Sequence, residues 1–319
     1  NRSGNEFALS SRDVQDWGIS EHTFHRAIEF MIENDLLRVT VTQWGAQIKS
    51  VVRKSDGVEH IWSGNPEVWK YHTPVMFPYC GKVKDGRIEI RGRVVENAPA
   101  HGVVRTLTHE LVSQTADSLT LAVSSSEETL SIFPYHFRFL TTFRLEGECL
   151  HYTLTVENTD NEDFPFGIGY HPGFAIPFDD QHSALDYELR FSDMESPICM
   201  ETPTGLLNGR YYVLGNNMQS IPVTDKMFDA GSHCMVNLTS KTLGIYEKDS
   251  GRAVVCEISG HPYCLIWSQP GMPQFVCIEP WHSLPSTEEG SYAWEDKAAA
   301  AVVQPGRSWS TTMKIAFVR

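Results

Sequence analysis

The sequence predicts an all-β protein built as one large antiparallel β-sandwich or barrel. From residue 28 onward, short runs of alternating apolar and polar residues prevail, and helical periodicity is almost absent. Glycine, aspartate, asparagine and proline separate these runs at close spacing, which is typical of antiparallel sandwiches. No tandem repeat, low-complexity tract or linker interrupts residues 26–319. We therefore expect one domain there, preceded by an N-terminal appendage at residues 1–25.

The expected strands are spread along this domain. They are residues 37–41, 48–52, 119–123, 137–143, 150–156, 254–258 and 309–317. Residues 150–156 alternate most regularly, which predicts a half-buried strand. Asp85-Gly86 predicts a hairpin over residues 83–90, because these residue types favour tight two-residue turns. Residues 296–301 (Asp-Lys-Ala-Ala-Ala-Ala) are the helical candidate of the domain, and the polar appendage has another near residues 10–17.

The charge balance disfavours several kinds of partner. The 319 residues include 26 Lys and Arg against 40 Asp and Glu, which leaves a net charge of −14. We therefore expect no nucleic-acid or anionic-membrane partner and a neutral or weakly charged ligand, with a local basic pocket as the alternative. No apolar run reaches membrane-span length, and we see no signal-peptide pattern. The seven cysteines form no C-x-x-C pair, which predicts reduced thiols in a cytoplasmic protein.

One stretch, residues 164–178, surrounds a histidine with glycine, proline and aromatic residues. It has the sequence Gly-Tyr-His-Pro-Gly-Phe around His171. Proline restricts its own backbone and that of the residue before it, so the imidazole is held on stiff, non-helical chain. An imidazole that is held still and titrates near neutral pH suits proton exchange. The alternative is a core histidine hydrogen-bonded to a carbonyl group.

An acid occupies a comparable setting near the C-terminus. Glu279 follows the apolar run 275–278 and precedes Pro280 and Trp281. Apolar neighbours predict partial desolvation, which raises the pKa of a carboxyl group toward the range of a useful general base. A surface salt bridge is the alternative, and the apolar residues before Glu279 make it the weaker one.

Five other residues are candidates for ligand contacts: Lys82, His101, Arg105, Asp229 and Trp267. Several of them also have a structural interpretation. Lys82 and Arg105 are able to pair with any of the chain's many acids, and Asp229 suits a turn in its Asp-Ala-Gly context. Trp267 fits a hydrophobic core, although a flat aromatic face also packs well against the C–H side of a pyranose.

Taken in order, these residues resemble the aldose 1-epimerase (galactose mutarotase) family, in its branch of short bacterial-type homologues. That branch has Gly-x-His-Pro-x-Phe followed by Ile-Glu-Pro-Trp, and the chain has Gly169-Tyr-His171-Pro-Gly-Phe174 and Ile278-Glu279-Pro-Trp281. Supporting matches follow in family order from about residue 28: Gly45-Ala46, Asn65-Pro66, Phe77-Pro78, Gly81, His101-Gly102, Arg105, Pro134-Tyr-His-Phe137, Asn158 and Trp267. Each motif is weak alone, and the ordered set is strong.

The resemblance implies a galactose mutarotase-like β-supersandwich that binds a hexose on its concave face. It places the general acid on His171 and the general base on Glu279. It places contacts to the substrate hydroxyl groups on His101, Arg105 and Asp229.

The chain also departs from the family pattern. Lys82 stands where the family has an arginine, and a lysine lacks the planar fork of a guanidinium. Residues 1–25 have no counterpart in the family, so we expect hexose binding to persist without them.

The resemblance and the residues both favour an isomerase that interconverts the α and β anomers of free aldohexoses, of the galactose or glucose type. Opening the ring takes a proton from O1 and donates one to the ring oxygen, which requires one base, one acid and no cofactor or metal. We expect His171 and Glu279 to point across a cleft, about the width of a sugar ring apart.

Two other functions remain open. A hexose-6-phosphate mutarotase would need a cationic cluster, which Arg105 and Lys82 begin without an obvious third member. A non-catalytic carbohydrate-binding protein would keep the aromatic residues and lose the acid or the base, and both are present here. The sequence also leaves both a monomer and a homodimer open.

Overall fold

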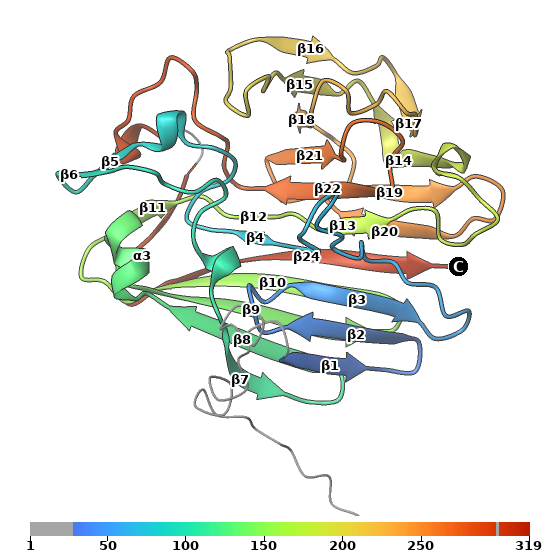
Figure 1. The fold of residues 1–319 in the computed structure, drawn as a ribbon, viewed down its shortest axis with the longest axis horizontal. Helices are drawn as coiled ribbons and strands as arrows, with labels where there is room; N and C mark the ends of the chain where they lie inside the picture. The colour runs from blue at the N-terminus through green and yellow to red at the C-terminus, as the bar shows by residue number, and fades with distance from the viewer. Residues whose placement is uncertain (1–27, 298–299) are drawn as a thin grey trace, which may run out of the picture.

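Residues 28–297 and 300–319 are described by the computed structural model, and they form a nearly all-β fold (Figure 1). The helical elements in these residues are short: one α-helix, α3 (Glu127–Ile132), and the 3₁₀ turns η1 (Lys84–Gly86), η2 (Val104–Thr106), η3 (Ala184–Asp186) and η4 (Trp294–Asp296). The prediction of an all-β antiparallel architecture is confirmed. The predicted appendage, residues 1–25, lies outside the described residues. Within the described part, no helix has the length and apolar character needed to cross a membrane.

The larger sheet has nine strands in the order β17-β14-β19-β20-β24-β10-β9-β8-β7. The strands are β7 (Glu110–Gln114), β8 (Ser118–Ser124), β9 (Phe137–Glu146), β10 (Cys149–Asn158), β14 (Tyr187–Glu195), β17 (Met218–Pro222), β19 (Thr242–Glu247), β20 (Ala253–Glu257) and β24 (Ser308–Val318). Along β10, buried and half-buried residues alternate without interruption. This pattern confirms the strand predicted from its alternating sequence.

The second sheet has eight strands, in the order β16-β15-β18-β21-β22-β12-β4 with β13 also paired to β22. The strands are β4 (Val75–Met76), β12 (Gly169–Tyr170), β13 (Gly173–Ala175), β15 (Ile198–Met200), β16 (Tyr211–Val213), β18 (His233–Val236), β21 (Tyr263–Trp267) and β22 (Phe275–Trp281). All seven residues of β22 are buried. Both predicted motifs lie in this sheet, one on β22 and the other along β12 and β13.

Three small sheets complete the fold. One contains β1 (Glu29–Glu33), β2 (Leu37–Thr42) and β3 (Ile48–Arg53). The others pair β5 (Ile88–Ile90) with β6 (Arg93–Val95), and β11 (Phe164–Phe166) with β23 (Ala301–Val303).

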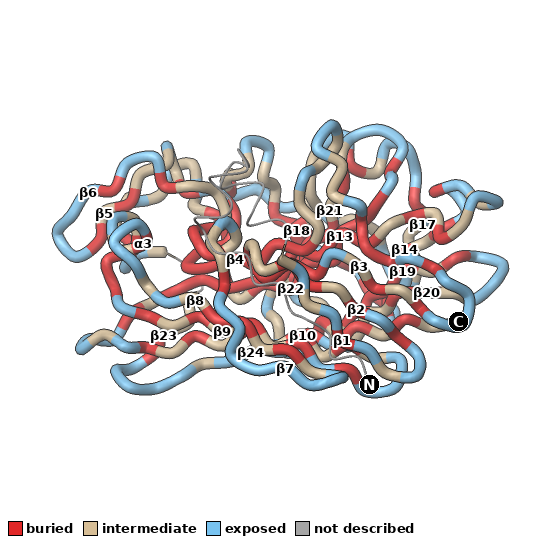
Figure 2. Tube along the Cα trace, turned by 60° about the horizontal axis from the view of Figure 1, so that its bottom comes forward, coloured by how far each residue is buried: buried red, intermediate tan, exposed pale blue. Residues whose placement is uncertain are grey.

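The core lies between the layers, where buried segments run through the middle of the molecule (Figure 2). Tyr170 of β12 links the two large sheets directly. Its hydroxyl lies 3.0 Å from the carbonyl oxygen of Tyr152 on β10 and 2.8 Å from that of Thr311 on β24. Because Tyr170 precedes His171 in the chain, this anchor holds the histidine segment against the larger sheet.

Two local predictions are wrong. Lys84–Gly86 forms the turn η1, and the hairpin instead joins β5 and β6 at Arg91-Gly92, where both residues have positive φ. The predicted helix at residues 296–301 is replaced at its end by β23, in which Ala301 pairs with Phe166 of β11, and residues 298–299 are outside the description. Tertiary pairing outweighs the helix propensity of alanine here.

Candidate functional site

Glu279 projects from β22, and His171 projects from the two-residue connection between β12 and β13, which both pair with β22. Gly169 pairs with Trp281, and Gly173 pairs with Cys277, so the same antiparallel register brackets both residues. His171 and Glu279 are therefore opposite each other, and the His171 Nδ1 lies 3.5 Å from the Glu279 Oε1. The expectation that a sugar ring's width would separate them is wrong, because the strand pairs on either side of His171 place it next to Glu279.

The two glycines around His171 are required by close packing. A Cβ on Gly169 would lie 2.6 Å from Cδ1 of Trp281, and a Cβ on Gly173 would lie 2.8 Å from Cζ3 of Trp69. Neither position tolerates a larger residue without moving an indole ring. The glycines of the motif thus let two tryptophans approach the backbone on either side of the imidazole.

Burial shifts both groups away from their ordinary protonation. Glu279 is 1% exposed and His171 is 8% exposed. Desolvation raises the pKa of Glu279 well above its usual value. Desolvation, together with the positive charge of Arg105, lowers the pKa of His171 to about 3. Burial therefore favours the uncharged form of the pair, with the proton on Glu279 and a neutral His171.

The pair also has unused hydrogen-bonding capacity. Nδ1 of His171 and Oε2 of Glu279 are buried and have no hydrogen-bond partner. Because Glu279 is buried, the surface salt bridge considered as its alternative is excluded. Two buried polar atoms that face one cavity without partners are ready to bind the oxygen atoms of a ligand.

Tryptophan side chains enclose the imidazole. The ring of Trp69 stacks on His171 with centroids 5.0 Å apart, and Trp267 meets both rings edge-on at 5.4 and 5.7 Å. Trp281 donates a hydrogen bond from its indole nitrogen to the Tyr170 carbonyl oxygen at 3.1 Å. Sequence reasoning missed Trp69, because no motif identifies it beyond the nearby Asn65-Pro66.

These residues line one cavity of about 340 Å³, a size that suits a small ligand. Six of the seven predicted site residues are among its lining: Lys82, His101, Arg105, His171, Trp267 and Glu279. The structure thus brings together residues that are almost 200 positions apart in the chain.

His101 has a defined hydrogen-bonding role. Its Nδ1 accepts a hydrogen bond from the Gly81 backbone N–H at 3.1 Å. Its own backbone N–H donates to the Gly81 carbonyl oxygen at 2.8 Å. Burial lowers the pKa of His101 well below its usual value, so the ring is neutral and its proton lies on Nε2. His101 can therefore donate one hydrogen bond from Nε2 to a ligand.

A family model described as aldose 1-epimerase matches residues 29–316, which is most of the chain. The chain belongs to the aldose 1-epimerase family. The LacX protein of Lactococcus lactis subsp. lactis is 28% identical over 283 residues, covering 86% of this chain and 94% of LacX. A galactose mutarotase-like protein from Lactobacillus casei is 25% identical, with a TM-score of 0.83 over 91% of this chain and 99% of its own. A galactose mutarotase related enzyme from Lactobacillus acidophilus shares the fold, with 24% identity and a TM-score of 0.87 over 92% of this chain and 98% of its own.

In this aldose 1-epimerase family member, Asp229 does not join the other predicted site residues. It is exposed in a turn, where its backbone N–H donates to the Lys226 carbonyl oxygen at 3.2 Å, and it is not among the residues that line the cavity. Its position matches the interpretation of Asp-Ala-Gly as a turn. We therefore leave Asp229 out of the proposed site.

Two groups of side chains have the spacing of metal ligands. Donor atoms of His171, Cys277 and Glu279 lie within 4.8 Å of one another. Burial raises the pKa of the Cys277 thiol, which opposes the thiolate that a zinc site would need. The second group contains Asp179, His182 and Glu247.

That second group already has a counter-charge. The guanidinium of Arg252 donates hydrogen bonds to Asp179 and to Glu247, the latter at 2.7 Å. The Asp179 carboxylate also binds Nδ1 of His182 at 2.6 Å. Because the acids are paired, this group forms an ion-pair network in this structure.

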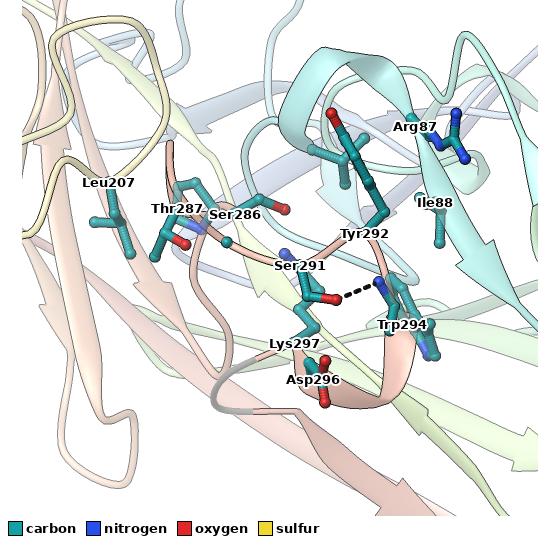
Figure 3. A pocket seen from close by; sticks show the side chains of 14 residues that line it. Arg87, Ile88, Leu207, Ser286, Thr287, Ser291, Tyr292, Trp294, Asp296 and Lys297 are labelled. Carbon is teal, nitrogen blue, oxygen red and sulfur yellow. Dashed lines mark hydrogen bonds between the residues drawn. The ribbon is translucent and has the colours of Figure 1, made fainter.

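A second, smaller cavity of about 80 Å³ lies beside the turn η4 (Figure 3). Its lining includes Arg87, Tyr292 and Lys297, and the Ala293 backbone N–H donates to the Ser291 hydroxyl at 3.0 Å. The Lys297 ammonium donates to the Leu284 carbonyl oxygen at 2.9 Å. This volume is too small for a hexose, so this cavity is not a candidate sugar site.

Proposed function

We propose that this chain interconverts the α and β anomers of an aldohexose by acid–base opening of the sugar ring. One observation carries the proposal. Two buried groups with opposite pKa shifts, His171 and Glu279, lie 3.5 Å apart in an aromatic cavity of an aldose 1-epimerase family fold. Groups whose environments push their pKa values apart are the usual partners in acid–base catalysis.

The proposed steps balance with a single proton in the pair. The Glu279 carboxylate takes the proton from O1, a C1=O1 carbonyl forms, the bond between C1 and the ring oxygen breaks, and the ring oxygen takes a proton from His171. After C1 turns its other face, the same steps run in reverse. O1 and the ring oxygen are bonded to one carbon, so neighbouring side chains are suited to serve them.

The protonation that burial favours in the His171 and Glu279 pair fits the middle of this cycle. After ring opening, Glu279 holds the proton and His171 is neutral, which is the uncharged form that burial favours. Ring opening itself begins from a protonated His171 and an ionised Glu279. The environment therefore supports the state that accompanies the open-chain sugar, and substrate contacts must support the charged one.

The remaining contacts would orient the sugar. The Nε2 proton of His101 and the guanidinium of Arg105 supply donors to hydroxyl groups. The faces of Trp69 and Trp267 supply apolar surface for the C–H side of the ring. Lys82 adds an ammonium group at the cavity wall.

Polarimetry tests this function. Fresh α-D-galactose and α-D-glucose should reach their equilibrium rotation faster with the protein than without it. Glu279→Gln should slow the catalysed rate by about 10²–10⁴-fold. Glu257→Gln, on β20 and outside the cavity, is the matched control and should keep the parental rate. Sugar binding without rate enhancement in the parent would reject the enzyme in favour of a carbohydrate-binding protein.

A further inference from the structure

We propose that His261 and His282, which meet at the hydroxyl group of Thr311, form a binding site for one divalent transition-metal ion such as Zn²⁺, Ni²⁺ or Cu²⁺. The two imidazole Nε2 atoms would ligate the ion, and water would complete its coordination. None of the three residues lines the cavity of His171 and Glu279, so the inference does not depend on the proposed function. The site is also separate from the two metal-ligand groups described above, which contain other residues.

The three residues come from different elements at the contact between the two large sheets. His261 lies in the turn between β20 and β21, His282 directly follows β22, and Thr311 lies on β24. β20 and β24 belong to the nine-stranded sheet, whereas β21 and β22 belong to the eight-stranded sheet (Figure 1). An ion held by both imidazoles would therefore tie a turn that connects the two sheets to the end of β22.

Both imidazoles point to the same place. Nε2 of His282 lies 3.0 Å from the Thr311 hydroxyl oxygen, and Nε2 of His261 lies 3.1 Å from that same oxygen. The two ring centres are 4.7 Å apart. Two imidazoles that bind one ion through nitrogen at about 2.0–2.1 Å, with about 90–109° between the bonds, have ring centres about 4.5–5.2 Å apart. The two rings therefore already have the spacing of neighbouring ligands of one ion.

Both imidazoles also favour the neutral form that metals bind. Burial lowers the pKa of His282 to about 4, and repulsion from the neighbouring His261 adds to that shift. Burial lowers the pKa of His261 as well, while the negative charge of Glu257 opposes the shift in part. Two neutral imidazoles offer their lone pairs at neutral pH, and the charge of Glu257 attracts a cation.

One hydroxyl group serves both rings in the metal-free protein. Thr311 has a single hydroxyl proton, so it donates to only one of the two Nε2 atoms, and the other imidazole must donate its own Nε2 proton to the hydroxyl oxygen. When an ion binds, that imidazole moves its proton to Nδ1, which changes the tautomer and leaves the charge unchanged. The ion then replaces the hydroxyl as the common partner of the two rings.

An ion can reach the two rings from solvent. His261 and His282 are half-buried, and the residues on either side of His261, Gly260 and Pro262, are exposed. A metal site needs such an entry path as well as suitable ligands.

The strand beside the site also supports the histidine segment of the sugar cavity. The carbonyl oxygen of Thr311 accepts the hydroxyl proton of Tyr170 at 2.8 Å, and Tyr170 precedes His171. An ion that binds only the folded state stabilises it in proportion to its occupancy. We therefore expect the ion to act as a structural clasp behind the sugar cavity.

Calorimetry and thermal unfolding of the full chain, after treatment with EDTA, test the inference with added Zn²⁺. Zn²⁺ should bind and should raise Tm as its concentration increases, whereas Mg²⁺, which prefers oxygen ligands, should do neither. Pulsed EPR with one equivalent of Cu²⁺ should show coupling to two imidazole rings. No Zn²⁺ binding up to about 1 mM overturns the inference, and so does Cu²⁺ coupled to one imidazole or to none.

Variants assign the binding to the two imidazoles. His261→Gln and His282→Gln should each lower the affinity for Zn²⁺ by about tenfold or more, because the loss of even an outer hydrogen-bond partner of a ligand costs about 10–100-fold. His136→Gln removes an exposed histidine outside the site and should keep the parental affinity. Equal Zn²⁺ affinity in the parent and in both site variants overturns the inference.

The design still decides if a variant fails to fold. If only one of His261→Gln and His282→Gln folds, its affinity for Zn²⁺ is compared with that of His136→Gln. If neither folds, the number of imidazole rings coupled to Cu²⁺ in the parent protein decides. None of these measurements follows sugar turnover, so the metal site and the proposed function stand or fall separately.

Discussion

Glu279→Gln should stabilise the folded protein while it removes the activity. The carboxyl group is 1% exposed, its Oε2 has no hydrogen-bond partner, and the imidazole beside it favours its neutral form. Burial therefore raises the pKa of Glu279 in the folded state above the ordinary value of 4.5. Glutamine has nearly the same shape and cannot ionise. The variant therefore does not lose free energy of unfolding when the pH rises past the ordinary pKa of a glutamate.

The sign and size of the effect follow from proton linkage. Below the unfolded pKa near 4.5, the carboxyl group is protonated in both states and costs nothing. As the pH rises toward the raised folded pKa, the unfolded state ionises first, and folding loses about 1.4 kcal/mol per pH unit. Between pH 4.5 and neutrality the loss reaches at most about 3.5 kcal/mol. For a domain of this size, a loss of that size shifts Tm by up to about 6 °C.

Thermal and denaturant unfolding from about pH 4 to about pH 8 measure this difference. The Tm of Glu279→Gln should equal that of the parent at the acid end and exceed it increasingly toward neutral pH. Glu257→Gln, which breaks the Lys314 ion pair of 3.3 Å, controls for the loss of a surface carboxylate. A Tm difference between Glu279→Gln and the parent that stays flat with pH, or a less stable variant at pH 7, would refute the account of Glu279 as a buried acid.

Three further results are expected. In polarimetric assays, His171→Asn should lower the mutarotation rate by about 10²–10⁴-fold. The double variant with Glu279→Gln should lose far less than the product of the two single-variant reductions. Full additivity would show that the residues act separately. The pH profile of kcat/KM should be bell-shaped, because activity needs one proton in the His171 and Glu279 pair. Below the lowered pKa of His171, about 3, the pair holds two protons and has no base. Above the raised pKa of Glu279, the pair holds no proton and has no acid. In Glu279→Gln only His171 can hold the proton of the pair, so the alkaline limb should move down toward the pKa of His171, about 3. A limb that stays at its parental position would contradict the assignment. Trp69→Ala should raise KM by about tenfold, while Trp69→Phe keeps most of the affinity, because the aromatic face supplies the contact; unchanged KM in the alanine variant would remove Trp69 from the site.

Much of the fold could be predicted because its signals are local. The alternation of residues 150–156 identifies β10, and the apolar run before Glu279 identifies a fully buried strand, β22. Local reasoning failed where another segment decided the outcome. Ala301 lies in a run of alanines yet pairs with Phe166 in a strand. The Asp85-Gly86 turn is real, but β5 follows it and turns at Arg91-Gly92.

By itself, the sequence determined the all-β class and the buried setting of His171 and Glu279. The two motifs around these residues also suggested membership of the aldose 1-epimerase family. Only the tertiary structure decided that these side chains are 3.5 Å apart, that Trp69 stacks on the imidazole, and that Asp229 lies elsewhere. The physical reason is that alternation along a strand specifies which of its residues point toward the buried face of the sheet. It does not specify which strands become neighbours or in which register, and those choices depend on the packing of the whole core.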